Sequence, residues 1–124
     1  MKQYFMQIPI SEETLKDITC EIVESLPYSW PLWHNDAPEF EKYKDTDMFL
    51  CDKVFDIIIN GGSVKVTDIE EDAEPKYELT LERLIKGIEK NAIERPWDSN
   101  LESMDGITAD CILQYAIFDE VIFG

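Results

Sequence analysis

The sequence has few of the residues from which catalytic and metal centres are usually built. Its 124 residues include one histidine, His34, and three cysteines, Cys20, Cys51 and Cys111. The cysteines are far apart and form no C-x-x-C pair, whereas a zinc site normally offers three or four ligands at recognisable spacing. We therefore expect three reduced, largely buried thiols in a reducing compartment, no metal, no cofactor and no catalytic residue. A nucleophilic pair of His34 with Cys51 or Cys111 stays open as an alternative, because such partners can be distant in sequence.

Long apolar runs are also missing. No stretch approaches the ~18 apolar residues that a membrane-spanning helix needs. Residues 1–10 contain two glutamines and a proline in place of a continuous apolar segment, so no signal peptide is expected. The pair Gly61-Gly62 lacks the spacing and the following Lys of a phosphate-binding loop. These absences predict a soluble, cytoplasmic protein that does not associate with membranes.

Basic residues are scarce. The chain has 27 Asp and Glu against 11 Lys and Arg, which gives a net charge of −16. Residues 1–62 hold 12 acids and 5 bases, and residues 63–124 hold 15 and 6, so the negative charge is spread along the chain. Aromatic residues make up 11%, more than a disordered acidic tail would contain. Binding to nucleic acid through phosphates needs clustered Lys and Arg, so we expect no direct nucleic-acid binding and a partner with a basic surface.

Four segments have apolar residues at the 3.6-residue period of a helix. We expect helices over residues 12–26, about 46–60, 81–94 and 109–118, capped by Ser11, by Asp45 or Thr46, by Thr80 and by Thr108 in turn. Asn60-Gly61 is also a hairpin signal, but three turns of helical periodicity precede it. We favour the helix, with Gly61 in the left-handed position at its end. Gly87 inside the third helix predicts a close contact with another helix.

Alternation of apolar and polar residues predicts a small sheet. Val64, Val66 and Ile69 indicate one strand, an acidic turn follows over 70–75, and Tyr77 and Leu79 indicate the return strand. Residues 3–8 and 120–124 are further short strand candidates. With 44% hydrophobic residues, we expect a single domain over 1–124 of the α+β class, a small antiparallel sheet packed by three or four helices.

The first predicted helix has a row of carboxylates. Glu13, Asp17, Glu21 and Glu24 recur at spacings of four, four and three, so they share one side of the helix. Carboxylates about 6 Å apart loosely imitate the phosphates of one nucleic-acid strand and could occupy a basic groove. The alternative is an ordinary solvated helix face.

An aromatic loop follows this helix. Residues 27–40 contain three prolines and four aromatic residues, and we expect them to be irregular. Trp30 and Trp33 could form a partner-binding surface, because Trp is enriched at interface hot spots. The alternative is that these rings pack the loop onto the core. Exposure of the two rings distinguishes these alternatives.

Two stretches of the C-terminal half, LTLERLIKGIE (79–89) and DGITADCILQYAIFDEVIFG (105–124), have a familiar pattern. From residue 46 onward the chain resembles small acidic proteins of prophages, plasmids and integrative elements that have no assigned activity. Asp119 stands where those proteins have Gly. The resemblance implies an accessory role in a mobile element and transfers no catalytic residue.

Together these features predict a non-enzymatic acidic binding protein. Its partner would be a basic protein surface, such as that of a host nucleic-acid-binding enzyme, and it would act as a nucleic-acid mimic of the anti-CRISPR or anti-restriction type. The alternative is a structural or assembly protein that forms a homo-oligomer through the aromatic loop, with acidity serving only solubility.

Overall fold

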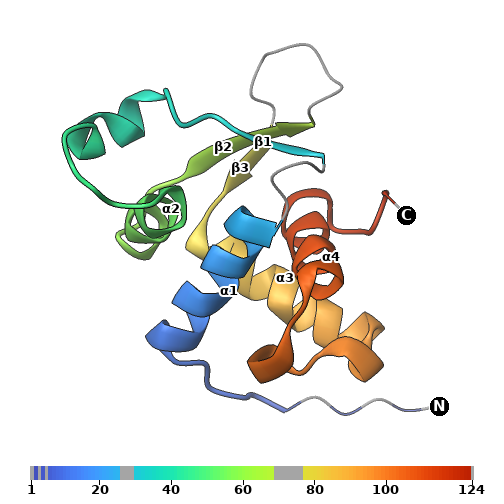
Figure 1. The fold of residues 1–124 in the computed structure, drawn as a ribbon. Coiled ribbons are helices and arrows are strands. Elements are labelled where there is room, and N and C mark those ends of the chain that lie inside the picture. The colour runs from blue at the N-terminus through green and yellow to red at the C-terminus, as the bar shows by residue number, and fades with distance from the viewer. Residues whose placement is uncertain (1, 3, 5, 26–29, 69–76, 124) are drawn as a thin grey trace.

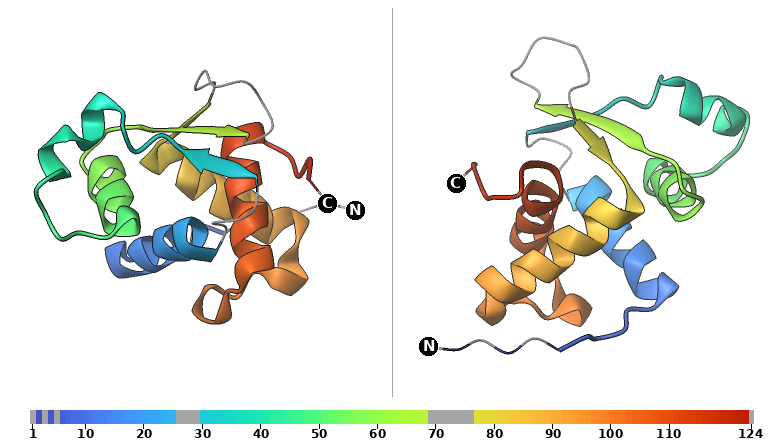
Figure 2. Two further views of the ribbon diagram at one scale, coloured as in Figure 1. Left: turned by 45° about the horizontal axis from the view of Figure 1, so that its top comes forward. Right: turned by 180° about the vertical axis from the view of Figure 1, so that it is seen from behind.

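The computed structural model describes residues 2, 4, 6–25, 30–68 and 77–123. Within these residues it is an α+β fold with one three-stranded antiparallel sheet, which confirms the predicted class. Figures 1 and 2 show the sheet lying across one side of α1, α3 and α4, with α2 beside one end of the sheet. The elements are α1 (Glu12–Ser25), β1 (Pro31–Trp33), α2 (Leu50–Ile59), β2 (Val64–Asp68), β3 (Tyr77–Leu79), α3 (Leu81–Glu94) and α4 (Gly106–Phe118), with 3-10 turns at Pro38–Tyr43, Pro96–Asp98 and Leu101–Ser103.

Helix α1 follows the sequence pattern closely. The hydroxyl of Ser11 accepts a hydrogen bond from the backbone N–H of Thr14 at 3.1 Å, so Ser11 caps the helix as predicted. The apolar stripe of α1 is buried against the rest of the molecule. Its buried members are Leu15, Ile18, Ile22 and Val23, together with Thr19.

Helix α2 begins later than predicted, at Leu50. The hydroxyl of Thr46 donates to the carbonyl oxygen of Tyr43 at 2.7 Å, so it completes the preceding 3-10 turn and does not cap α2. The predicted caps, Asp45 and Thr46, are therefore wrong. At the other end Gly61 has a φ of 90°, which confirms the left-handed helix stop.

The sheet has the order β1-β2-β3, with both neighbouring pairs antiparallel. Strands β2 and β3 confirm the predicted hairpin, although Ile69 and the turn at 70–75 lie outside the described residues. Strand β1 comes from the segment that we expected to be irregular, and Trp33 is paired with Val66 of β2. The predicted strand over 3–8 is wrong for the residues that are described, because residues 4 and 6–8 lie in no strand and Tyr4, Met6 and Ile8 are exposed. The described residues 120–123 also lie in no strand.

Helices α3 and α4 pack closely side by side. Thr80 caps α3 as predicted, since its side chain accepts from the N–H of Arg83. A Cβ atom added at Gly87 would lie 2.6 Å from the carbonyl oxygen of Ile112, so the predicted close helix contact is confirmed. The helical period of Leu81, Leu84, Ile85 and Ile88 predicts that all four lie on the buried face of α3, but Ile85 is exposed.

Helix α4 begins before its predicted cap. Asp105 accepts a hydrogen bond from the N–H of Thr108 at 2.9 Å and is the actual cap. The hydroxyl of Thr108 instead donates to Asp98 at 2.7 Å and to Asp105 at 3.0 Å, because this side chain is turned into the fold. The prediction that Thr108 caps α4 is therefore wrong by three residues.

The buried amide of Gln114 on α4 holds the C-terminal segment. Its oxygen accepts from the backbone N–H groups of Ile122 and Phe123, each at 2.8 Å. Its nitrogen donates to Asp110 at 3.0 Å and to the carbonyl oxygen of Phe123 at 3.3 Å. The amide thus satisfies backbone groups that would otherwise need a neighbouring strand. None of the helices in the described ranges has both the length and the apolar character to span a bilayer.

Candidate functional site

The carboxylate row of α1 lies largely on the solvent side of the helix. Glu13, Asp17 and Glu24 are exposed. Glu21 is half-buried and accepts a hydrogen bond from the hydroxyl of Ser25 at 2.6 Å, which turns it along its own helix. The structure therefore places three of the four predicted carboxylates on the exposed surface and gives the fourth a local partner.

The one basic side chain of α1 does not neutralise this row. The ammonium group of Lys16 lies 3.7 Å from the carboxylate of Asp52 on α2. Glu13 and Asp17 make no ion pair within the part of the chain that the structure describes. Like charges at this spacing cost an isolated helix ~0.2–0.5 kcal/mol per pair, so the row adds nothing to helix stability. We define the acidic face as Glu13, Asp17 and Glu24.

Glu24 has a second role at the junction with α2. Its carboxylate accepts a hydrogen bond from the thiol of Cys51 at 3.1 Å. The thiol of Cys20 points to the carboxylate of Asp52, with 3.9 Å between sulfur and oxygen. Sequence analysis did not bring Cys20 and Cys51 together, because no local spacing links residues that two different helices carry.

The cysteines are poorly suited to nucleophilic catalysis. Burial is the largest cause that raises the pKa of Cys20 and Cys51, and nearby carboxylates add to the rise. Burial also raises the pKa of Cys111, which lies on α4. All three thiols are therefore protonated near neutral pH, whereas the thiolate is the reactive form.

In the part of the chain that the structure describes, His34 forms a hydrogen bond with the sheet and not with a cysteine. Its Nε2 atom lies 2.5 Å from the hydroxyl of Thr67 on β2. Among the described residues, no cysteine is a hydrogen-bond partner of His34. The structure thus does not assemble the Cys–His pair that the sequence left open.

The aromatic loop packs onto the core. Trp30 is 7% exposed, and its indole N–H donates to Asp110 at 2.7 Å. Its ring centroid lies 5.0 Å from that of Phe118 and 5.2 Å from that of Phe123. Trp33 is half-buried against the same core, and its indole nitrogen is buried with no hydrogen-bond partner among the residues that the structure describes. By the test of exposure, Trp30 offers no surface to a partner, and Trp33 offers part of one ring.

Other large rings of the chain, among them Trp97 and Phe49, are exposed. Trp97 is 77% exposed and Phe49 is 73% exposed. Phe49 directly precedes α2, and Trp97 lies in a short 3-10 turn. Neither ring belongs to an apolar stripe of helical period, so the periodicity that predicts buried residues makes no prediction for these two side chains.

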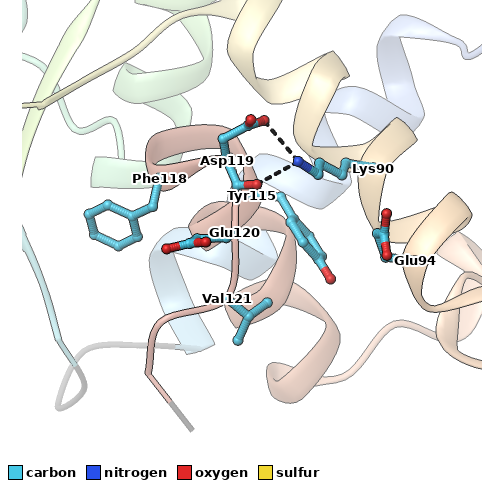
Figure 3. A pocket seen from close by; sticks show the side chains of 7 residues that line it. All are labelled: Lys90, Glu94, Tyr115, Phe118, Asp119, Glu120 and Val121. Carbon is cyan, nitrogen blue, oxygen red and sulfur yellow. Dashed lines mark hydrogen bonds and ion pairs between the residues drawn. The ribbon is translucent and has the colours of Figure 1, made fainter.

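An open hollow of about 520 Å³ lies beside the C-terminal end of α4 (Figure 3). The ammonium group of Lys90 occupies one side, where it donates to the carbonyl oxygen of Asp119 at 2.6 Å and lies 3.2 Å from its carboxylate. Asp119 has a φ of 64°, a left-handed conformation that Gly adopts most readily. We assign no chemistry to the hollow. Its lining consists of Lys90, Glu94, Tyr115, Phe118, Asp119, Glu120 and Val121.

Comparison of the chain with known protein families, with curated proteins and with solved structures finds no match.

Proposed function

We propose that this protein is a non-enzymatic acidic binding protein that engages a basic surface of another protein through the acidic face of α1. The observation that carries the proposal is the separation of charges on that helix. Glu13 and Asp17 are exposed without a cationic partner in the described residues, while Lys16 is turned to Asp52 on α2. A net charge of −16 attracts a basic partner at long range, and these carboxylates present that charge on a rigid helix.

The partner that fits this surface best is an enzyme that handles nucleic acid. Such an enzyme has a basic groove that tracks a regular row of phosphates. Carboxylates one helical turn apart, at ~6 Å, can follow part of such a row. The resemblance to proteins of mobile elements supports a host defence nuclease as the target, with inhibition of the anti-CRISPR or anti-restriction type.

A pull-down from host lysate, eluted along a salt gradient, tests the proposal. We expect a nucleic-acid-binding enzyme that is released at moderate salt and is competed away by DNA or RNA. Recovery of only the protein itself, or of partners indifferent to salt and to nucleic acid, would contradict the proposal and favour self-association.

Two matched double variants then locate the interface. Glu13→Lys with Asp17→Lys reverses two charges on the acidic face, and Glu82→Lys with Glu89→Lys makes the same change in net charge on exposed positions of α3. Glu13 and Glu82 are both the second residue of their helices, so the effect on the helix dipole is matched.

Exposed ion pairs contribute ~0.2–1 kcal/mol each, and a reversal also adds repulsion, so the α1 variant should bind about tenfold more weakly or worse. The α3 variant should lose much less. Equal losses would show that only net charge matters, and an unchanged affinity of the α1 variant would remove α1 from the interface.

A further inference from the structure

The junction of α1 and α2 has two thiols and two carboxylates, and zinc in proteins is bound by both kinds of ligand. The sulfur atoms of Cys20 and Cys51 and a carboxylate oxygen of Asp52 all lie within 4.8 Å of one another. Glu24, one turn after Cys20 on α1, places its carboxylate oxygen 3.1 Å from the sulfur of Cys51. Three potential ligands thus lie together at the junction, and Glu24, which is outside that group of three, contacts one of them.

The present contacts show what a cation would replace. Each thiol directs its hydrogen toward a carboxylate, Cys51 toward Glu24 and Cys20 toward Asp52. A metal ion that displaces these two protons would bind two thiolates and two carboxylates. In a tetrahedral zinc site, with Zn–S of about 2.3 Å and Zn–O of about 2.0–2.2 Å, the ligand atoms lie roughly 3–4 Å apart. To reach that size, the four side chains would have to rotate so that their sulfur and oxygen atoms come closer together than they are now.

We propose that Cys20, Glu24, Cys51 and Asp52 form a binding site for one thiophilic divalent cation of the zinc class. Thiolates select such cations over magnesium and calcium, which prefer oxygen ligands alone. Binding releases two thiol protons to solvent, and the four anionic ligands together with the divalent cation then have a net charge of −2. Lys16, 3.7 Å from Asp52, offsets part of that charge.

The bound cation would join α1 to α2. Cys51 is 3% exposed and Cys20 is half-buried, so the site lies at the edge of the core with access from one side. This inference goes beyond the proposed function: it shares only Glu24 with the acidic face and uses neither Glu13 nor Asp17. The sequence conceals the site, since Cys20 and Cys51 belong to different helices and match no zinc motif.

Titration of the reduced protein with Co²⁺ tests the site, because cobalt bound to thiolate has a charge-transfer absorption in the near ultraviolet. We expect this absorption to saturate at one equivalent and to disappear when Zn²⁺ is added. Cys20→Ser should abolish it, and Glu24→Gln should weaken cobalt binding at least tenfold. Cys111→Ser removes a buried thiol on α4 and is the matched control, which should bind as the unchanged protein does.

Cys20 is the chosen thiol because it is half-buried, so its replacement disturbs the core less than that of Cys51. Far-ultraviolet circular dichroism confirms that each variant is folded. The proposal is overturned if the folded, reduced wild-type protein shows no charge-transfer absorption, or if Cys20→Ser keeps it. Formation of a Cys20–Cys51 disulfide in air, with no cobalt binding by the reduced form, would equally overturn it and identify a redox pair instead.

Discussion

The contact between α3 and α4 at Gly87 predicts that Gly87→Ala destabilises the protein, which is the opposite of what helix propensity alone predicts. In a helix interior, replacing Gly with Ala normally stabilises by up to ~1 kcal/mol. At Gly87 the new Cβ atom would lie 2.6 Å from the carbonyl oxygen of Ile112 and 2.9 Å from both the N and the Cβ atoms of Ala116. Two of these three atoms belong to the backbone of α4, so no side-chain rotation can relieve the clash.

The magnitude follows from these two opposing effects. Overpacking a well-packed interface costs ~1–3 kcal/mol, and rigid backbone contacts place this site in the upper part of that range. When the gain in helix propensity is subtracted from this cost, Gly87→Ala should destabilise the protein by about 1–2 kcal/mol. That corresponds to a fall in Tm of roughly 4–8 °C for a chain of this size.

Thermal and urea unfolding followed by circular dichroism measure the effect. Lys86→Ala and Lys86→Gly at the exposed neighbouring position calibrate the intrinsic difference between Ala and Gly in α3, where Ala should be the more stable. If Gly87→Ala proves as stable as the wild type or more so, α3 and α4 do not approach as closely as described, and the reasoning fails.

Two further predictions concern α4. Gln114→Leu leaves the N–H groups of Ile122 and Phe123 without their acceptor. The substitution should therefore destabilise the protein by about 1–3 kcal/mol and speed hydrogen exchange at those two amides. Slow exchange at both amides in the variant would show that Gln114 does not hold the C-terminal segment. Hydrogen bonds from the backbone and side chain of Thr108 lower the pKa of the Asp105 carboxyl, so its contribution to stability is present above the ordinary Asp pKa and is lost as the pH falls through the lowered value. Asp105→Asn keeps a capping side chain without the charge, so the stability advantage of the wild type over this variant should shrink in acid. A difference that is constant with pH would show that the carboxylate charge is not involved.

The sequence alone determined those features that depend on neighbours within one or two turns. The apolar stripe of α1 and the caps Ser11 and Thr80 could be predicted, because helical periodicity and capping are local. The exposed position of Glu13 and Asp17 followed from the same periodicity, since they lie opposite the stripe. The left-handed Gly61 and the close contact at Gly87 were also predictable, because glycine at such positions has few other uses.

Only the tertiary structure decided the features that join distant segments. Strand β1 forms because Trp33 pairs with Val66, and no local pattern in a proline-rich loop indicates that pairing. No local pattern indicates the contact of Trp30 either, because its indole N–H donates to Asp110, which is eighty residues away. Packing of α1 against α2 turned Lys16 away from the acidic face. It also brought Cys20 to Cys51, because side chains on separate helices meet only where the apolar stripes of those helices require it.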